Sequence, residues 1–224
     1  MDQSSLAPKH NPTIFFEVKK TWSNAPRSLS EETVAQLLET LQSTAITPLR
    51  TRDWAIVELL YDCMLRPCEA CGLDLSNVDF ESRKILVLGK GGKERVIDLI
   101  PAASYALSSY LLHSRPVLLR MSTTRSFFVS VRGRRLSRQH IWGIVSAALP
   151  EAYPYKLRHS GAKHLSDHGA SLEDIQEGLG HKDPSTTAIY TEGVSTENLA
   201  EAHRRFHPRA KKHGRPDSRP NRRG

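Results

Sequence analysis

The sequence predicts a mainly α-helical fold with one small antiparallel β-sheet, an α+β class. Apolar residues recur at helical spacing in successive segments between about residues 28 and 180, and several of these segments begin and end with capping residues. Strand-like runs separated by turn residues occur only in the region 77–99. With 224 residues, 38% of them hydrophobic, the chain can bury one sizeable core rather than two large ones.

Two helices are predicted first, over residues 28–45 and 51–64. Ser30 is the expected N-cap of the first helix, since its hydroxyl can accept a hydrogen bond from the first turn. Apolar residues at helical spacing give each helix a buried stripe: Val34, Leu37, Leu38 and Leu41 in the first, and Trp54, Val57, Leu60, Tyr61 and Met64 in the second. The second helix therefore ends at the words Leu65-Arg66-Pro67.

The β region contains three short predicted strands, VDFE, KILVLG and ERVIDL. A glycine-rich hairpin turn, residues 89–93, joins the last two and carries Lys90 and Lys93. A Walker-type phosphate loop is excluded, because that loop needs a longer glycine spacing and a Lys followed by Ser or Thr. The turn is either an exposed basic loop or a flexible pair of ammonium groups that reaches into a groove.

A further helix is predicted over residues 101–121, followed by a short extended piece at Phe127-Phe128. Four arginines then cluster before another helix, which covers residues 141–149: Arg132, Arg134, Arg135 and Arg138. Two interpretations of this cluster remain open, a surface for a polyanion or a solvated basic loop.

Residues 156–190 contain three short helices with clear boundaries. The first ends at Gly169, and the second begins at Ser171, with Asp174 at the third position of a capping box, and ends at Gly180. Asp183-Pro184 is typical of an N-cap followed by proline at the first helical position.

Composition restricts the class of protein. The net charge of +8 favours a polyanionic partner. No apolar run approaches the ~20 residues of a membrane span, and residues 1–12 lack a signal-peptide core, so we expect a cytoplasmic protein with no membrane partner. The three cysteines, Cys63, Cys68 and Cys71, do not suggest a disulfide framework. The C-x-x-C word has no second ligand pair, so no metal site is predicted.

Four polar residues remain at the edges of the last three helices: Arg158, His159, His181 and Tyr190. An arginine and two histidines can donate hydrogen bonds to one phosphate, and a tyrosine oxygen can act as a covalent nucleophile. Taken one by one, each of these residues is equally compatible with an ordinary position at the edge of the core.

The stretch LRHSGAKHLSDHGASLEDIQEGLGHKDPSTTAIY resembles the C-terminal signature of the tyrosine recombinases, the phage integrase and Xer group. The resemblance covers about residues 28 to 210 and implies that family's catalytic-domain fold. It also implies that Arg158 of the LRH word is the second catalytic arginine, that His181 of the LGH word is catalytic, and that Tyr190 is the nucleophile.

The resemblance extends upstream. Arg66 matches the first catalytic arginine of a GLR-x-x-E-type word, and Glu69 matches the acidic residue that follows it. Glu69 lies one helical turn after Arg66 and can hold its guanidinium, although an ordinary surface ion pair would have the same spacing. Lys90 matches a catalytic lysine of the family's β-hairpin, where it would protonate the leaving oxygen.

The sequence departs from the family at two places. Tyr155 occupies the position where the family usually has His, three residues before Arg158, and a phenol with a pKa near ~10 is a poor general base. Residues 1–26 form only a short extension, where most integrases have a DNA-clamping domain. The expected organisation is therefore this extension, a catalytic domain over residues 27–206 and a basic disordered tail over residues 207–224.

The resemblance implies a site-specific DNA recombinase that cuts and rejoins strands through a 3′-phosphotyrosine, with no metal or other cofactor. Double-stranded DNA is the implied substrate, bound by a homo-multimer on paired sites or with a helper protein. His159 and Glu69 would support the site, and DNA contacts are expected from Tyr155, Lys93, Arg134, Arg135 and Arg138. Two alternatives stay open, a type IB topoisomerase-like enzyme that reseals the same strand, and a catalytically weak or inactive regulatory DNA-binding relative.

Overall fold

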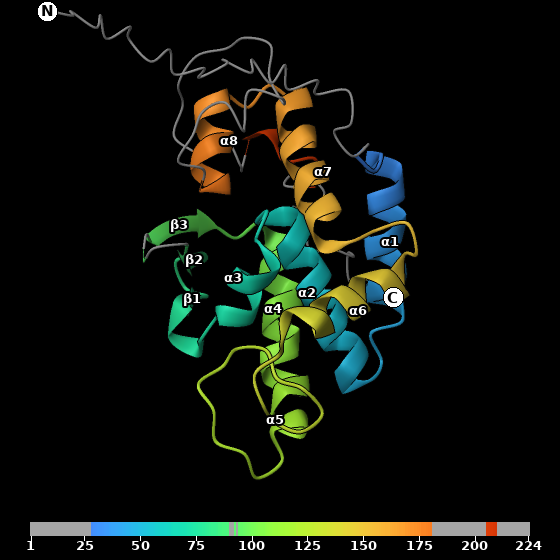
Figure 1. Cartoon of the computed structure of the whole chain (residues 1–224), viewed down its shortest axis with the longest axis vertical. Coiled ribbons are helices and arrows are strands. Elements are labelled where there is room, and N and C mark those ends of the chain that lie inside the picture. The colour runs from blue at the N-terminus through green and yellow to red at the C-terminus, as the bar shows by residue number, and fades with distance from the viewer. Residues whose placement is uncertain (1–27, 90–91, 93, 181–204, 210–224) are drawn as a thin grey trace, which may run out of the picture.

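The computed structural model describes residues 28–89, 92, 94–180 and 205–209. The small sheet lies at one side of the helices, with α7 and α8 at one end of the molecule and α5 at the other (Figure 1). The predicted mainly helical α+β class is confirmed. In chain order the elements are α1 (Glu31–Ser43), α2 (Pro48–Asp62), α3 (Pro67–Gly72), η1 (Leu75–Asn77), β1 (Val78–Asp79), β2 (Lys84–Leu88), β3 (Glu94–Asp98), α4 (Pro101–Ser109), η2 (Tyr110–Ser114), α5 (Arg115–Leu119), α6 (Arg138–Ala148), α7 (Pro154–Asp167) and α8 (Leu172–Leu179).

Helix α2 is the centre of the core, because it packs against α1, α3, α4, α5, α6, η2 and α7. Its apolar side chains are buried around the whole helix rather than along one stripe, including Trp54, Ile56, Leu59 and Leu60. A smaller apolar cluster joins α7 to α8 and includes Met64, Leu165 and Ile175. The arrangement places the C-terminal end of α2, and therefore Arg66, next to α7 and α8.

The three strands form one antiparallel sheet in the order β1-β2-β3. Leu86 pairs with Val96 at the middle of the β2–β3 ladder, and Leu88 pairs with Glu94 at the end where the hairpin turn joins the strands. Ile85 and Val87 alternate into the core, which is the period-2 pattern that the strand prediction used.

Local capping explains the helix boundaries. The Ser30 hydroxyl accepts from the backbone N–H of Thr33, and the Ser171 hydroxyl accepts from that of Asp174, so both predicted N-caps are confirmed. The predicted helix 101–121 is interrupted by one wide turn, η2, in which the Arg115 N–H donates to the Tyr110 carbonyl. Pro116 lacks the N–H that a regular α-helix needs there, which accounts for the wide turn.

Two carboxylates one turn apart on α2, Glu58 and Asp62, are completely buried. Arg209 donates to both oxygens of Glu58, and Trp54 Nε1 donates to Oε1 at 2.9 Å. His207 Nε2 lies 3.2 Å from Asp62 Oδ1. Burial, followed by the neighbouring Glu58 charge, raises the pKa of Asp62 well above its usual value. The compensating positive charge therefore comes from residues that follow in the sequence by about 150 positions.

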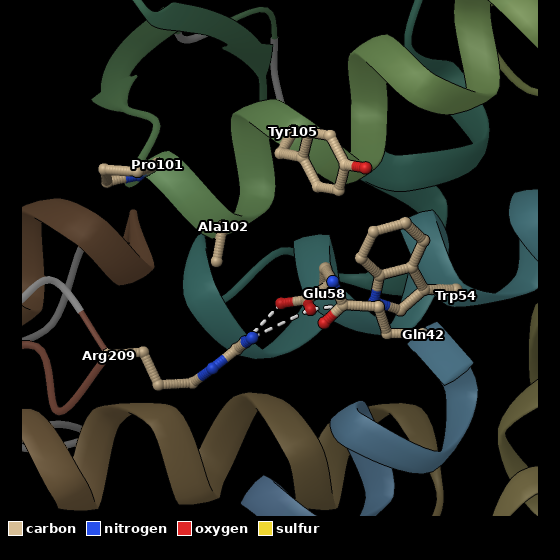
Figure 2. Close-up of a pocket in the computed structure, with 7 residues that line it drawn as sticks. All are labelled: Gln42, Trp54, Glu58, Pro101, Ala102, Tyr105 and Arg209. Carbon is tan, nitrogen blue, oxygen red and sulfur yellow. Dashed lines mark hydrogen bonds and ion pairs between the residues drawn. The ribbon is translucent and has the colours of Figure 1, made fainter. Parts of the chain in front are cut away.

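The described residues 205–209 pack against α2. His207, which the sequence analysis assigns to the basic tail, is buried, and the Arg209 side chain is only 13% exposed. Both lie where two buried carboxylates need a cationic partner. Arg209 and Glu58 line a cavity of about 280 Å³ together with Trp54 and Tyr105, and Figure 2 shows the two rings on the far side of Glu58 from Arg209.

Within the part of the chain that the structure describes, no helix is both long enough and apolar enough to cross a bilayer.

Replacing Arg209 with Ala is expected to lower the free energy of unfolding by about 3–5 kcal/mol, because it leaves Glu58 charged and buried without its partner. Replacing the exposed Arg205 with Ala is the control, with an expected loss under about 1 kcal/mol. Urea denaturation measures both. The double change Glu58→Gln with Arg209→Ala should recover part of the loss. Equal stabilities of the Arg209→Ala and Arg205→Ala variants would show that the Arg209–Glu58 ion pair does not hold residues 205–209 against α2.

Candidate active site

Arg66 lies between α2 and α3, where it is the N-cap of α3. Its backbone N–H donates to Glu69 Oε2 at 2.8 Å, and its Nη1 donates to Glu69 Oε1 at 2.8 Å. The side chain stays 25% exposed, so its remaining donors face the surface. The pairing expected from the sequence is present, but Glu69 is a buried group rather than half of a surface ion pair.

The Glu69 carboxylate is where three guanidinium groups meet. Arg95, on β3, donates to both carboxylate oxygens, at 3.0 Å and 2.8 Å. Arg158, on α7, lies 3.7 Å from Oε2. Burial alone would raise the pKa of Glu69, but the hydrogen bonds and charge of Arg95, the Arg66 N–H and the charge of Arg158 together lower it below its usual value. Glu69 is therefore held in its charged form.

The same three arginines bind the C-terminal end of α8. Arg95 Nε donates to the Gly178 carbonyl at 3.0 Å, and Arg158 Nη2 donates to the Leu179 carbonyl at 2.6 Å. Arg66 Nη2 reaches the Gly180 carbonyl at 3.4 Å. The last carbonyls of a helix lack intrahelical partners and carry partial negative charge, so cations stabilise them. The end of α8 is thereby fixed directly before His181.

Arg158 is buried and is fixed from two sides, since its Nη1 also donates to the carbonyl of Met64. Met64 has φ = 50°, a left-handed conformation that costs a non-glycine residue about 1–2 kcal/mol. The turn between α2 and α3 stores this strain and directs the Met64 carbonyl at the guanidinium.

Two glycines allow this close packing. A Cβ on Gly161 of α7 would lie 2.5 Å from the Tyr61 carbonyl of α2, so only glycine lets these helices approach so closely. Gly180 has φ = 59°, and a Cβ there would lie 3.1 Å from Arg95 Nη1. Gly161 of the word HSG therefore lets α7, which carries Arg158, pack closely on α2, and Gly180 of the word LGH leaves room for the Arg95 side chain.

Arg95 is the residue that the sequence interpretation missed. One arginine on a strand that alternates between exposed and buried positions is ordinary, and nothing in the ERVIDL word distinguishes it. Only the pairing of β3 beside α8 shows that its side chain faces Glu69.

His159 and Tyr155 lie one turn apart on α7. His159 is half-buried, and burial, followed by the charges of Lys163 and His164, lowers its pKa and favours the neutral imidazole. Tyr155 is 47% exposed, at the first turn of the helix that holds Arg158. Both residues therefore lie on the helix that carries Arg158, and the Tyr155 side chain is accessible to solvent.

Four predicted residues lie outside the described part of the chain: Lys90, Lys93, His181 and Tyr190. Their neighbours are placed. Gly89 and Gly92 flank Lys90 in the β2–β3 turn, and Gly180 directly precedes His181. The chain thus brings together Arg66, Glu69 and Arg158 at the point from which it continues towards the predicted nucleophile.

A family model described as the phage integrase family matches residues 27–196. The chain belongs to the phage integrase family. Curated relatives include a protein named tyrosine recombinase XerD from Proteus mirabilis, which is 39% identical over 209 residues, or 89% of this chain and 65% of that protein. A XerD from Haemophilus influenzae is 38% identical and is covered to 68%. The chain therefore spans about two thirds of the length of these phage integrase relatives.

Solved structures of recombinases share the fold. XerA recombinase superimposes with a TM-score of 0.64 at 29% identity, over 86% of this chain and 68% of that one. XerH site-specific recombinase, solved with its difH substrate, gives a TM-score of 0.65 at 24% identity over 75% of this chain, a likeness in fold. The fold predicted from the resemblance is thus confirmed as that of the phage integrase family.

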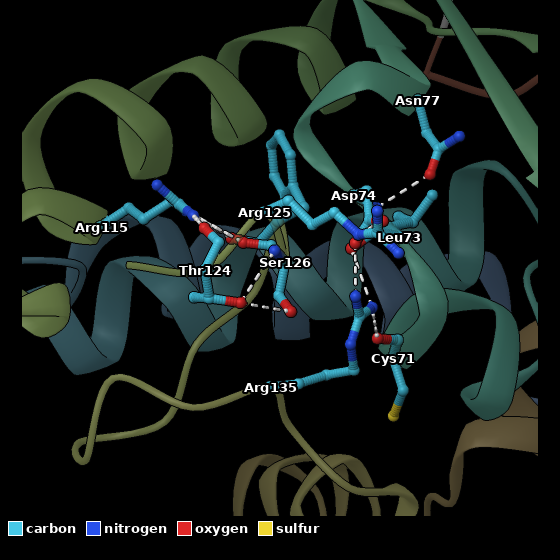
Figure 3. A network of polar contacts seen from close by, with 10 residues as sticks. Cys71, Leu73, Asp74, Asn77, Arg115, Thr124, Arg125, Ser126 and Arg135 are labelled. Carbon is cyan, nitrogen blue, oxygen red and sulfur yellow. Dashed lines mark hydrogen bonds and ion pairs between the residues drawn. The ribbon is translucent and has the colours of Figure 1, made fainter. Parts of the chain in front are cut away.

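The arginine cluster before α6 divides into two kinds in this phage integrase fold. Arg135 donates to Asp74 and to the carbonyls of Cys71 and Leu73, so its guanidinium ties η1 to α3 (Figure 3). Arg134 and Arg138 are exposed, and the described residues form no ion pair with them. Arg135 has a structural partner that the sequence did not reveal, whereas Arg134 and Arg138 keep their charge at the surface.

No group of three His, Cys, Asp or Glu side chains within the described ranges is placed to hold a metal ion. The C-x-x-C word lies in α3, with Cys68 exposed and Cys71 half-buried.

Glu69→Gln is expected to destabilise this phage integrase domain by about 3 kcal/mol at pH 7, because it removes the charge that compensates buried Arg95 and Arg158. Glu69 has a lowered pKa, so its contribution is present above the unfolded-state pKa and is lost as pH falls through the folded-state pKa. The difference between wild type and variant should therefore shrink on acidification below about pH 4.5.

Thermal or urea unfolding between pH 7 and pH 3 measures this difference. Glu94→Gln, a change on the exposed side of β3, is the matched control and should alter stability by less than about 0.5 kcal/mol. A Glu69→Gln deficit that stays constant over the whole pH range would contradict the role of the Glu69 charge.

Proposed function

We propose that the protein is a site-specific DNA recombinase that cuts and rejoins strands through a 3′-phosphotyrosine. The observation that carries the proposal is the convergence of Arg66 and Arg158 on Glu69, where the chain leaves Gly180 towards His181 and Tyr190. Membership of the phage integrase family and relatives named XerD recombinases support the same activity.

The chemistry begins with attack of the Tyr190 oxygen on a phosphorus atom of the DNA backbone, as the phenol proton passes to water. A bond forms between this oxygen and phosphorus, the bond to the 5′-oxygen breaks, and that oxygen leaves as a hydroxyl after receiving a proton from Lys90. The guanidinium groups of Arg66 and Arg158 neutralise the phosphate in the transition state, and His181 donates a further hydrogen bond. Attack by a 5′-hydroxyl reverses the step, so the phosphotyrosine conserves the bond energy.

The structure is consistent with a preformed phosphate site. Glu69, α8 and the Met64 carbonyl fix Arg158, which lowers the reorganisation needed on binding. The contact of Arg66 with Gly180 is long, at 3.4 Å, and solvent-exposed, so a phosphate oxygen can replace that carbonyl most easily. Arg66 is therefore the arginine that we expect to move onto the phosphate.

We propose double-stranded DNA as the substrate and an assembly on paired sites, formed with further copies of this chain or with a helper protein. XerH was solved with its difH substrate, which supports a DNA partner for a domain of this fold. Arg134, Arg138 and Tyr155 are exposed and are the proposed contacts to the DNA backbone. We further propose that the enzyme works in the cytoplasm, in association with its DNA.

Tyr190→Phe is expected to abolish covalent protein–DNA adducts on a suicide substrate while leaving DNA binding nearly unchanged, because it deletes only the attacking oxygen. Denaturing gel electrophoresis detects the adduct, and gel shift measures binding. Adducts at the wild-type level in the variant would exclude Tyr190. Adducts in the wild type without strand transfer between two duplexes would instead favour the topoisomerase-like alternative.

Cleavage is also expected to continue in excess EDTA, since guanidinium groups supply the positive charge that a metal supplies elsewhere. A strict Mg²⁺ requirement for adduct formation would contradict the mechanism.

Arg134→Ala and Arg138→Ala are each expected to weaken DNA binding without unfolding the protein. Each lost phosphate contact should reduce the slope of log affinity against log salt concentration by about 0.9 for duplex DNA. Arg135→Ala is the informative comparison, because it breaks the contacts with Asp74 and Cys71 and should lower stability as well. Unchanged salt slopes in both Arg134 and Arg138 variants would show that this loop does not contact DNA.

A further inference from the structure

Cys68 and Cys71 lie on the same short helix as Glu69, one on each side of it. Both are free thiols; Cys68 is exposed and Cys71 is half-buried. The sequence interpretation rejected a metal site for this C-x-x-C word, and the proposed chemistry uses neither sulfur. Cys68 nevertheless directly precedes Glu69, whose carboxylate organises the arginines, and only Ala70 separates Glu69 from Cys71.

The helical spacing places the two sulfurs within reach of each other. Residues three apart in an α-helix have Cα atoms about 5 Å apart, which falls inside the range of about 4.4–6.8 Å found for disulfides. Their Cβ atoms, however, lie about 5–6 Å apart, whereas a disulfide needs about 3.5–4.5 Å. Linking Cys68 to Cys71 therefore requires the turn of α3 to tighten by about 1–2 Å.

The two ends of α3 are not equally free to move when the helical turn tightens. The Cys71 carbonyl accepts a 2.8 Å hydrogen bond from Arg135, which is itself bound to Asp74, so this end is fixed (Figure 3). Cys68 is exposed and precedes Glu69 directly. The displacement is thus directed towards Glu69, whose carboxylate holds Arg66 and Arg95.

We propose that Cys68 and Cys71 form a reversible disulfide under oxidising conditions, and that this disulfide displaces Glu69 and switches off the arginine site. The effect on catalysis rests on the proposed recombinase function, whereas formation of the disulfide does not.

A peroxide is the oxidant class that fits the exposure of the pair. The Cys68 thiolate attacks one peroxide oxygen, the O–O bond breaks, and a sulfenic acid and a hydroxide form; the hydroxide takes a proton from solvent and becomes water. The sulfur of Cys71 then attacks the Cys68 sulfur, the S–S bond forms, and the hydroxyl group leaves with the Cys71 thiol proton as a second water. Burial, and then the neighbouring Cys68, raises the pKa of Cys71 to about 11, so Cys71 is the resolving thiol and accessible Cys68 the attacking one. Thiol reductants restore both groups.

The test uses the full chain treated with hydrogen peroxide and then alkylated under denaturing conditions. Intact mass spectrometry should show a loss of about 2 Da and one remaining alkylated cysteine, the buried Cys63, with the Cys68–Cys71 link identified after digestion. Cys68→Ser and Cys71→Ser should each prevent the link. A chain that keeps three alkylatable thiols, or that links Cys63 instead, would overturn the proposal.

The functional arm compares adduct formation on a suicide DNA substrate before and after oxidation. The oxidised wild type should react about 10²-fold more slowly, the scale expected when catalytic groups shift by about 1 Å, and a thiol reductant should restore the rate. The double variant Cys68→Ser/Cys71→Ser should keep its activity in both conditions. Undiminished activity of a protein shown by mass to carry the disulfide would overturn the switch. Failure of the reduced wild type and double variant alike to form adducts would instead refute the recombinase function, leaving the mass result to decide on the disulfide.

Discussion

The site depends on one buried carboxylate, that of Glu69. A charged group in this position is tolerated only with close compensation, and the compensation comes from three separate elements: the N-cap of α3, strand β3 and helix α7. Because each guanidinium also binds a carbonyl at the end of α8, that helix is positioned by the same charges. The geometry of the proposed phosphate site thus results from the requirement to keep one acid ionised inside the protein.

Helix α2 ends near this cluster and carries a second set of buried charges earlier along its length. In this second cluster too, the acids and their cationic partners come from different segments. Glu58 and Asp62 belong to α2, and their partners His207 and Arg209 lie far away in the sequence. Buried ion pairs add little net stability compared with well-packed apolar residues, but leaving one unpaired costs several kcal/mol, about 3–5 in measured cases. Both clusters therefore select one arrangement of the chain over alternatives that an apolar core would also accept.

Local signals in the sequence accounted for the helices and strands well. Serine caps, left-handed glycines and alternating apolar residues act within one or two turns, so Ser30, Ser171 and the β2–β3 hairpin could be read directly. The pairing of Arg66 with Glu69 could also be predicted from the sequence, because the two residues are one helical turn apart. Arg95, the structural engagement of Arg135 and the burial of Arg209 were not, since each depends on a partner far away in the chain. The family resemblance supplied Arg158, whose burial no local pattern indicates.

The distance between Glu58 and Arg209 along the chain also has a consequence for protein synthesis. The central helix is made early, but its acidic groups gain their arginine partner about 150 residues later. A nascent chain that ends before Arg209 holds two carboxylates that must either stay hydrated or take up protons, and both requirements oppose closure of the core around α2. We expect the domain to consolidate only after translation has passed Arg209, and therefore after the segment with Tyr190 has been made. A product truncated between Tyr190 and Arg209 would therefore contain the proposed nucleophile without a stably packed domain around it.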